Sequence, residues 1–412
     1  MGRDGSHDRQ SRAPNGIGVK LDAEAWSKRR GIARILAALD STSGHVRYVG
    51  GAVRDDLLGL PISDIDLATS FLPDDVVTRL EKARIKAVPT GIAHGTITAV
   101  ADGQPVEITT LRCDVSTDGR RATVAFSDDW AADAARRDFT INALYADPQS
   151  GEISDYFGGL DDLRNRRVRF IGDPLRRIAE DHLRILRFFR FHARFGSGEP
   201  DPDGLSGCAA RANDLMALSR ERIADELIKI LDIEDPTPTV ALMIARGILK
   251  PVIPEILSPE PLANLVATEQ AAGIEPAALR RLSALLPRDP AIAADVAARL
   301  KLSNKAKKRL EAAADPDLGT NPQALAYWIG QEAALDRLLL AGESDKAREL
   351  AGWAVPRLPI SGGQLIKRGV TEGPLVARTL KAIEREWVAK GFPDGEKWEN
   401  IVAGEVASAK GG

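Results

Sequence analysis

The chain has 412 residues, of which 44% are hydrophobic and 28% charged, and this is the composition of a globular protein with room for two or three domains. A net charge of −3 argues against indiscriminate binding to nucleic acid, although a local basic face is compatible with it. Two cysteines, Cys113 and Cys208, cannot build a disulfide framework, and we find neither an apolar run of membrane-span length nor a signal-peptide core, so we expect a protein of the reducing cytoplasm.

The first part of the chain predicts a tail, a helical segment and a strand. Residues 1–18 are polar and rich in glycine, serine and arginine, so we expect a disordered tail, and residues 21–39 have helical spacing. Val46–Val49 predicts a buried strand that leads into Gly50-Gly51 and a helix ending near Leu58. Glycines such as Gly51 let a backbone approach a triphosphate closely, and Arg54 supplies a planar, permanently charged fork for its oxygens.

A second strand is expected over Asp64–Thr69. The period of two in a strand puts Asp64 and Asp66 on one face, roughly 6.5 Å apart along the chain. Two such carboxylates can hold a pair of Mg²⁺ ions roughly 3.5–4 Å apart, as in-line phosphoryl displacement requires. Alone, each element is more often an ordinary turn or a solvated strand edge. Together they indicate nucleotidyl transfer.

A helix opened by proline is expected over Pro73–Lys82. Thr96–Val100 and Val106–Leu111 predict a hairpin across the turn pair Asp102-Gly103. Glu107 lies on the second of these strands. If that strand neighbours the one with Asp64, about 4.8 Å away, Glu107 is a candidate third catalytic carboxylate. An outward-facing strand glutamate is an equally good interpretation.

From Asp128 onward we expect an almost wholly helical chain. On a helix, Asp138 and Asn142 share a face, where the neighbouring Arg137 could bind phosphate and the asparagine a ribose hydroxyl. A salt-bridged helix surface is the alternative. Residues 164–194 hold ten arginines and three acidic residues, with phenylalanines between them, which favours a basic face that contacts phosphate.

Asp181 and Arg184 are three residues apart, so a helix would place them side by side. Such a pair is often only a surface ion pair. It could also accept a hydrogen bond from the amine of cytosine or adenine and donate one to the adjacent ring atom. This arrangement would reject guanine and uracil. Arg187 and Arg190 continue the spacing, but on a straight helix Arg190 points roughly opposite to Asp181.

The passage 49–59 followed by 64–69 closely resembles the first motif of the class II tRNA nucleotidyltransferases, the CCA-adding enzymes, whose superfamily includes bacterial poly(A) polymerases. Residues 135–144 look like the family's Arg-Arg-Asp-x-x-x-Asn-Ala motif, 155–163 its hinge, 180–184 its Glu-Asp-x-x-Arg motif, and 219–229 its neck helix. His94 lies in a run similar to the family's Gly-x-x-His-Gly-Thr turn, where a structural role is at least as expected as one near the metals. The resemblance covers about residues 46–229.

The resemblance implies an α+β fold, with a small mixed-sheet head followed by an all-α neck, body and tail. We therefore expect a head over 19–146, a neck for nucleotide selection over 147–232, and a tRNA-binding body and tail over 233–412. It also implies Mg²⁺ as cofactor, held by Asp64 and Asp66. The nucleotide-binding residues are then Gly51, Arg54, Arg137, Asp181, Arg184, Arg187 and Arg190.

The expected function is template-independent addition of C, C and A to the 3′ end of tRNA from CTP and ATP. The alternatives are a bacterial poly(A) polymerase, an enzyme that adds only part of CCA, and an RNA-binding module on an inactive fold. A loop over Cys113–Phe126, in the place of one that CC-only enzymes lack, favours full addition. No histidine follows position 192, so we expect no C-terminal phosphohydrolase domain. We expect no membrane partner, and the oligomeric state is not predicted.

Overall fold

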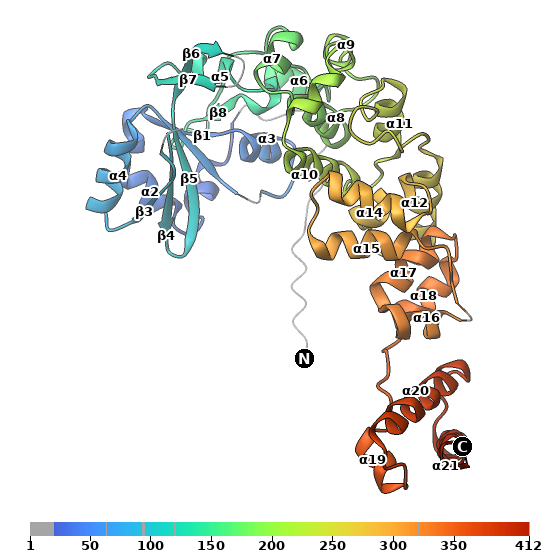
Figure 1. Ribbon diagram of the computed structural model, residues 1–412. Helices are drawn as coiled ribbons and strands as arrows, with labels where there is room; N and C mark the ends of the chain where they lie inside the picture. Colours follow the sequence, from blue (N-terminus) through green and yellow to red (C-terminus); the bar gives the residue numbers. More distant parts are fainter. Residues whose placement is uncertain (1–19, 63, 93–94, 119–120, 320, 412) are drawn as a thin grey trace, which may run out of the picture. The chain divides into compact units, whose positions relative to one another are not determined.

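The computed structural model describes residues 20–62, 64–92, 95–118, 121–319 and 321–411 (Figure 1). The chain divides into two compact units, Met1–Ala217 and Leu218–Gly412. The predicted N-terminal tail and His94 lie outside the described residues. The predicted division into head, neck, body and tail is finer than this and stays a prediction.

The first unit is built on a seven-stranded mixed sheet in the order β3-β4-β5-β2-β1-β8-β9. Only β2 and β5 pair in parallel; the other neighbours are antiparallel. The strands are β1 (Val46–Val49), β2 (Asp66–Thr69), β3 (Lys86–Gly91), β4 (Thr96–Ala101), β5 (Gln104–Thr110), β8 (Leu144–Ala146) and β9 (Ile153–Asp155).

Several predicted elements of this unit are confirmed. The strand Val46–Val49 and the helix α4 (Pro73–Lys82) have the expected bounds, and α3 (Gly51–Leu57) follows Gly50 as expected. The β4–β5 hairpin turns at Asp102 and Gly103, both with positive φ, as a two-residue turn matched to strand twist requires.

Three regions differ in detail from the expectations. The segment expected to be helical is two helices, α1 (Ala23–Ser27) and α2 (Ile32–Ala38), separated at Gly31. Gly31 has φ 81°, and a Cβ there would lie 2.5 Å from the carbonyl oxygen of Ala101. The chain after Asp128 is almost wholly helical in its regular structure, as expected, but β8 and β9 add two short strands to the sheet. The loop expected over Cys113–Phe126 is a hairpin of two strands, β6 (Arg112–Asp118) and β7 (Arg121–Phe126), and Gly119 and Arg120 between them lie outside the described residues.

Short helices complete the first unit: α5 (Trp130–Ala135), α6 (Gly159–Arg164), α7 (Pro174–Glu180), α8 (Arg184–Phe195) and α9 (Pro202–Ala210), with 3₁₀ turns at Ser41–Ser43, Thr140–Asn142 and Ala212–Ala217. The buried face of α8 contributes Phe188 and Phe191 to a cluster with Phe139 and Phe170. This cluster fixes α8 against the segment that follows α5. A Cβ on Gly159 would lie 2.3 Å from the carbonyl oxygen of Thr140, so α6 packs backbone to backbone on that segment.

The second unit is helical throughout its regular structure (Figure 1). Its helices are α10 (Arg220–Leu231), α11 (Thr237–Ala245), α12 (Glu260–Ala272), α13 (Ala278–Leu285), α14 (Pro290–Arg299), α15 (Asn304–Ala314), α16 (Pro322–Ile329), α17 (Gln331–Leu340), α18 (Ser344–Ala351), α19 (Gly362–Lys367), α20 (Gly373–Ala389) and α21 (Gly395–Gly411). The helix expected over 219–229 is α10, capped by Ser219. A mixed-sheet head followed by a helical remainder is the predicted α+β class.

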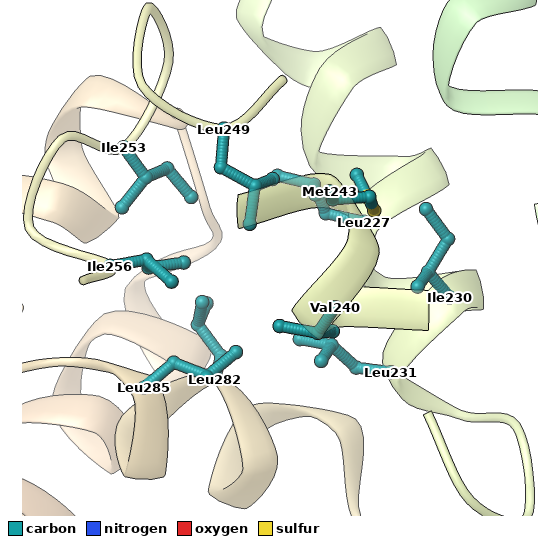
Figure 2. A pocket seen from close by; sticks show the side chains of 10 residues that line it. All are labelled: Leu227, Ile230, Leu231, Val240, Met243, Leu249, Ile253, Ile256, Leu282 and Leu285. Atoms are coloured by element: carbon teal, nitrogen blue, oxygen red, sulfur yellow. The ribbon is translucent and has the colours of Figure 1, made fainter. Parts of the chain in front are cut away.

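A cavity of about 10 Å³ lies among α10, α11, α13 and residues 249–256 of the second unit (Figure 2). That is about the space of one water molecule. All ten lining side chains are apolar, so the cavity is a packing defect of the core and not a ligand site. No helix within the described residues is long and apolar enough to cross a bilayer.

Buried ion pairs hold four helices of the second unit together. Asp336 of α17 accepts hydrogen bonds from Arg280 of α13 (2.8 Å to Nε) and Arg309 of α15 (2.7 Å to Nε), and Glu269 of α12 accepts from Arg280 and Arg281. Arg281, 1% exposed, also donates to the carbonyls of residues 231, 233 and 234. It therefore satisfies the last carbonyl of α10 and two carbonyls of the segment that follows the helix.

The two thiols differ in environment, which gives a first testable prediction. Cys208 is fully buried and burial raises the pKa of its thiol, whereas Cys113 is partly exposed. Because the thiolate is the reactive form, a thiol reagent should label one cysteine of the native protein and both after denaturation. Mass spectrometry of the labelled peptides checks this. Equal labelling rates in the native protein would contradict the packing around Cys208.

Candidate active site

Two predicted catalytic carboxylates meet on neighbouring strands. β2 and β5 pair in parallel with Asp66 opposite Glu107, so both side chains project from the same face of the sheet. The strand begins at Asp66 and not at Asp64 as predicted. The alternation nevertheless extends to Asp64, which is exposed, while Ile65 between the two is buried. The expectation that Glu107 lies beside the Asp64–Asp66 segment is confirmed.

These carboxylates form an electronegative site. Burial, together with the nearby Glu107 and Asp64 carboxylates, raises the pKa of Asp66 to about 6, while Arg137 acts in the opposite direction. Among the described residues, no group of three His, Cys, Asp or Glu side chains is arranged to hold a metal by itself. Mg²⁺, however, is commonly held by one or two carboxylates together with substrate phosphates and water. The donor set of Asp64 and Asp66, with Glu107 alongside, fits that mode.

Gly50 lets Arg137 lie close to the turn between β1 and α3. Gly50 has φ 73°, and a Cβ on it would lie 3.4 Å from Nη1 of Arg137. The Arg137 side chain is 23% exposed, and its positive charge is close enough to Asp66 to act on the pKa of that carboxyl. The structure thus brings together the glycine turn, the arginine and the carboxylate that the sequence proposed as parts of one site.

Arg54, which was predicted to contact the triphosphate, is buried. It is 6% exposed, its Nε donates to Asp55 Oδ1 at 2.8 Å, and its Nη1 donates to Asn142 Oδ1. Its guanidinium carbon also lies 4.0 Å from the ring centroid of Phe195 on α8. Arg54 therefore holds α3 against α8, and a direct contact with the nucleotide stays a prediction.

Asp138 and Asn142 do not lie on an α-helix, so that expectation was wrong. α5 ends at Ala135, and only a 3₁₀ turn over Thr140–Asn142 follows. The two side chains still meet, because Asn142 Nδ2 donates to Asp138 Oδ1 at 3.0 Å. Asp138 Oδ2 accepts from Nε of Arg187 at 2.8 Å and also pairs with its Nη2. Arg187, predicted to bind the nucleotide, thus ties α8 to this turn.

The predicted shared helix face of Asp181 and Arg184 was also wrong. α7 ends at Glu180, and α8 begins only at Arg184. Asp181 has an extended backbone, and its Oδ1 accepts from the main-chain N–H of Leu183 at 3.1 Å. The two candidate base-selecting residues therefore flank a break between helices. No continuous helix joins Asp181 to Arg190, so helix geometry does not require the two side chains to point in opposite directions.

Arg184 is firmly held. Its Nη1 donates to Glu180 Oε2 at 2.6 Å and to the carbonyl of Arg177 at 2.8 Å, and its Nη2 donates to the carbonyl of Arg136 at 3.1 Å. Arg190 lies over the ring of Phe191, with its guanidinium carbon 4.6 Å from the centroid. The break between α7 and α8 is thus pinned to the segment that also carries Arg137.

Three residues of this region were missed in the sequence. Asp133 and Tyr145, both buried, bind Arg137, and Asp162, fully buried, accepts from Thr140, Arg167 and Arg169. The spacing of Asp133, four residues before Arg137, was a usable signal. Tyr145 gave none, because its place depends on the pairing of β8 with β1.

Known proteins resemble this chain over most of its length. A family model described as the poly(A) polymerase head domain matches residues 46–169, and one described as a probable RNA- and SrmB-binding site of polymerase A matches residues 199–258. The mitochondrial CCA tRNA nucleotidyltransferase 1 of Mus musculus is 35% identical over 370 residues, which cover 84% of this chain and 83% of the mouse protein.

Bacterial relatives and a solved structure agree with this. The CCA-adding enzyme of Limosilactobacillus fermentum is 31% identical over 401 residues, covering 91% of this chain and 96% of that enzyme. The crystal structure of the Bacillus stearothermophilus CCA-adding enzyme in complex with CTP has a TM-score of 0.69 to this chain at 27% identity. The match covers 92% of this chain and 98% of the Bacillus stearothermophilus enzyme's chain.

Proposed function

The chain belongs to the family of CCA tRNA nucleotidyltransferases, and from this membership we propose that it adds C, C and A in turn to the 3′ end of tRNA, using CTP and ATP and no nucleic-acid template. The observation that carries the proposal is the pairing of Asp66 with Glu107 on the face that Arg137 and the Gly50-Gly51 turn approach. Carboxylates for metal, a turn for the triphosphate and a basic fork are the parts that nucleotidyl transfer needs. The Bacillus stearothermophilus CCA-adding enzyme was solved in complex with CTP, which supports CTP as one of the two nucleotide substrates proposed here.

Nucleotidyltransferases of this family typically use a divalent metal ion, and we propose Mg²⁺ here. Asp64 and Asp66 would hold it, with Glu107 as a third carboxylate at the same face. When bound, the metal lowers the pKa of the RNA 3′-hydroxyl and neutralises charge on the leaving pyrophosphate. Arg137 and the backbone at Gly51 orient the triphosphate so that the 3′-oxygen can attack the α-phosphorus in line with the departing pyrophosphate.

Selection of C and A would rest on Asp181 and Arg184. Cytosine and adenine both present an amine next to a ring acceptor, and guanine and uracil present the reverse order. Arg184 is suited to this role because Glu180 and two main-chain carbonyls hold its guanidinium in one orientation. Arg187 and Arg190 lie on the same helix, and we propose that they line the nucleotide side of α8.

Replacing Arg184 with alanine should therefore blur selection. We expect the preference for CTP and ATP over UTP and GTP to fall about tenfold or more, since a lost hydrogen bond to a charged group is worth about 1.5–3 kcal/mol. The measurement is single-nucleotide incorporation with each of the four triphosphates. Arg176→Ala is the matched control, because that side chain on α7 is 80% exposed. Unchanged selectivity in Arg184→Ala would refute the assignment.

The direct test is extension of tRNA transcripts that lack CCA, with Mg²⁺ and CTP, ATP or both, resolved at single-nucleotide length. Growth by two residues with CTP and by three with both nucleotides is the expected result. Growth that stops after two residues with both nucleotides would indicate a CC-adding enzyme. Growth only on a transcript that already ends in CC would indicate an A-adding enzyme. A long ladder with ATP alone would indicate a poly(A) polymerase. No growth under any condition would favour an RNA-binding module on an inactive fold.

A further inference from the structure

Arg137 is gripped on one side by two buried groups that the proposed chemistry does not name. Its Nε donates to the hydroxyl of Tyr145 at 3.0 Å, and its Nη2 donates to Asp133 Oδ2 at 3.2 Å. Tyr145 in turn donates its proton to the same Asp133 oxygen at 2.7 Å. The three groups close a ring of hydrogen bonds in which the tyrosine hydroxyl accepts from the cation and donates to the anion.

The other edge of the guanidinium lies at the glycine turn between β1 and α3. Its Nη1 makes a long hydrogen bond of 3.5 Å to the carbonyl of Asn142 and lies next to Gly50, where a Cβ would approach it to 3.4 Å. An arginine side chain without such support loses rotamer freedom when a ligand fixes it, and this loss opposes binding. With Nε and Nη2 already held, most of that freedom is lost before any ligand arrives.

We propose that Tyr145 and Asp133 are positioning residues, which orient Arg137 for the triphosphate of the incoming nucleotide. This rests on the proposed function and deepens it. Because the triphosphate is common to CTP and ATP, the two residues serve affinity for both nucleotides equally and contribute nothing to the choice of base. They are thereby separated in role from Asp181 and Arg184.

Tyr145 is the better residue to test. Asp133 also accepts a hydrogen bond from the main-chain N–H of Arg112 at 3.2 Å, so its replacement would disturb the start of β6 as well. Tyr145→Phe removes only the hydroxyl and keeps the ring, which packs edge-on against Trp130 with centroids 5.5 Å apart. The orienting contact is thus separable from the packing.

Tyr48 on β1 offers a matched control. It is as fully buried as Tyr145 and lies on the neighbouring strand, but its hydroxyl has no hydrogen-bond partner among the described residues. Tyr48→Phe should therefore leave nucleotide use unchanged. Thermal melting of both variants verifies that each remains folded.

The experiment is steady-state kinetics of the full-length protein with Mg²⁺ and two primers, a transcript lacking CCA and one lacking only the final A. For Tyr145→Phe we expect KM for CTP and for ATP to rise by the same factor, about tenfold, with KM for tRNA unchanged. In combination with Arg137→Lys, it should add no further loss, because both changes break the same contact.

Three outcomes would overturn the inference: a Tyr145→Phe variant that behaves like Tyr48→Phe, a KM that rises for only one nucleotide, or losses that multiply in the double variant. Wild-type extension of the two primers is the separate readout for the proposed function. If the wild type fails to extend tRNA, the proposed function fails. If it succeeds and Tyr145→Phe matches it, only the positioning role fails.

Discussion

Asp66→Asn is expected to lower nucleotide addition by roughly a thousandfold or more while leaving tRNA binding intact. The loss is expected because a neutral amide beside Asp64 would weaken the proposed metal site, and a metal that stabilises the departing pyrophosphate contributes several kcal/mol. Single-turnover extension with saturating Mg²⁺, CTP and ATP measures the rate, and a gel-shift titration measures tRNA affinity. Activity within tenfold of wild type would rule out Asp66 as a metal ligand.

The same substitution should stabilise the fold in EDTA. The pKa of Asp66 in the fold is about 6, above its ordinary value of 3.8, so the ionised carboxylate costs stability. The cost is absent below about pH 4, grows between pH 4 and 6 and is full above that, where it amounts to about 3 kcal/mol at most. Asp66→Asn should therefore melt higher than wild type at pH 7.5 and match it near pH 4. Mg²⁺ should raise the melting temperature of the wild type only, and the exposed Asp74→Asn serves as control.

Asp336→Ala is expected to destabilise the second unit by about 3–5 kcal/mol. Asp336 is fully buried and pairs with both Arg280 and Arg309, so its removal leaves the buried network with an excess of positive charge, for which Glu269 is the one buried carboxylate that remains among the described residues. Urea unfolding followed by tryptophan fluorescence is a suitable measurement, because Trp328, Trp353, Trp387 and Trp398 all lie in this unit. If the two units unfold separately, the urea curve shows two transitions. Only the midpoint of the second unit's transition should shift to a lower urea concentration.

Glu332→Gln is the matched control for Asp336→Ala. Glu332 binds the same Arg309, with 2.6 Å from Nη1 to Oε1, but its side chain is 56% exposed. Exposed pairs of this kind contribute about 0–1 kcal/mol. Equal shifts in the two variants would show that burial of the network is not what stabilises the packing of α13, α15 and α17.

Elements with a local signal could be predicted from the sequence. The glycine pair after Val49, the proline that opens α4 and the Asp102-Gly103 turn each constrain the backbone by themselves, so those boundaries agree with the structure. The placement of Glu107 beside Asp66 was also predictable as a possibility, but only the parallel pairing of β2 with β5 decides it.

Elements that depend on distant partners could not be predicted. β8 and β9 have three residues each and form because β1 offers an edge, which no local pattern indicates. The helical spacing at Asp181 and Arg184 was present in the sequence, but the chain turns there. Arg184 instead finds Glu180 and the carbonyl of Arg136, a residue far away in the sequence.

The strand order has a consequence for how the first unit forms during synthesis. β1 occupies the interior of the sheet, yet its second neighbour, β8, is made only after β2–β5 and the β6–β7 hairpin have been completed. The pairing of Val49 with Tyr145 therefore closes a long loop, a slow step in folding. Until then Arg137 lacks the strand that fixes it. A nascent chain thus exposes an open sheet edge, and Arg137, the proposed triphosphate ligand, is fixed only late, when β8 docks.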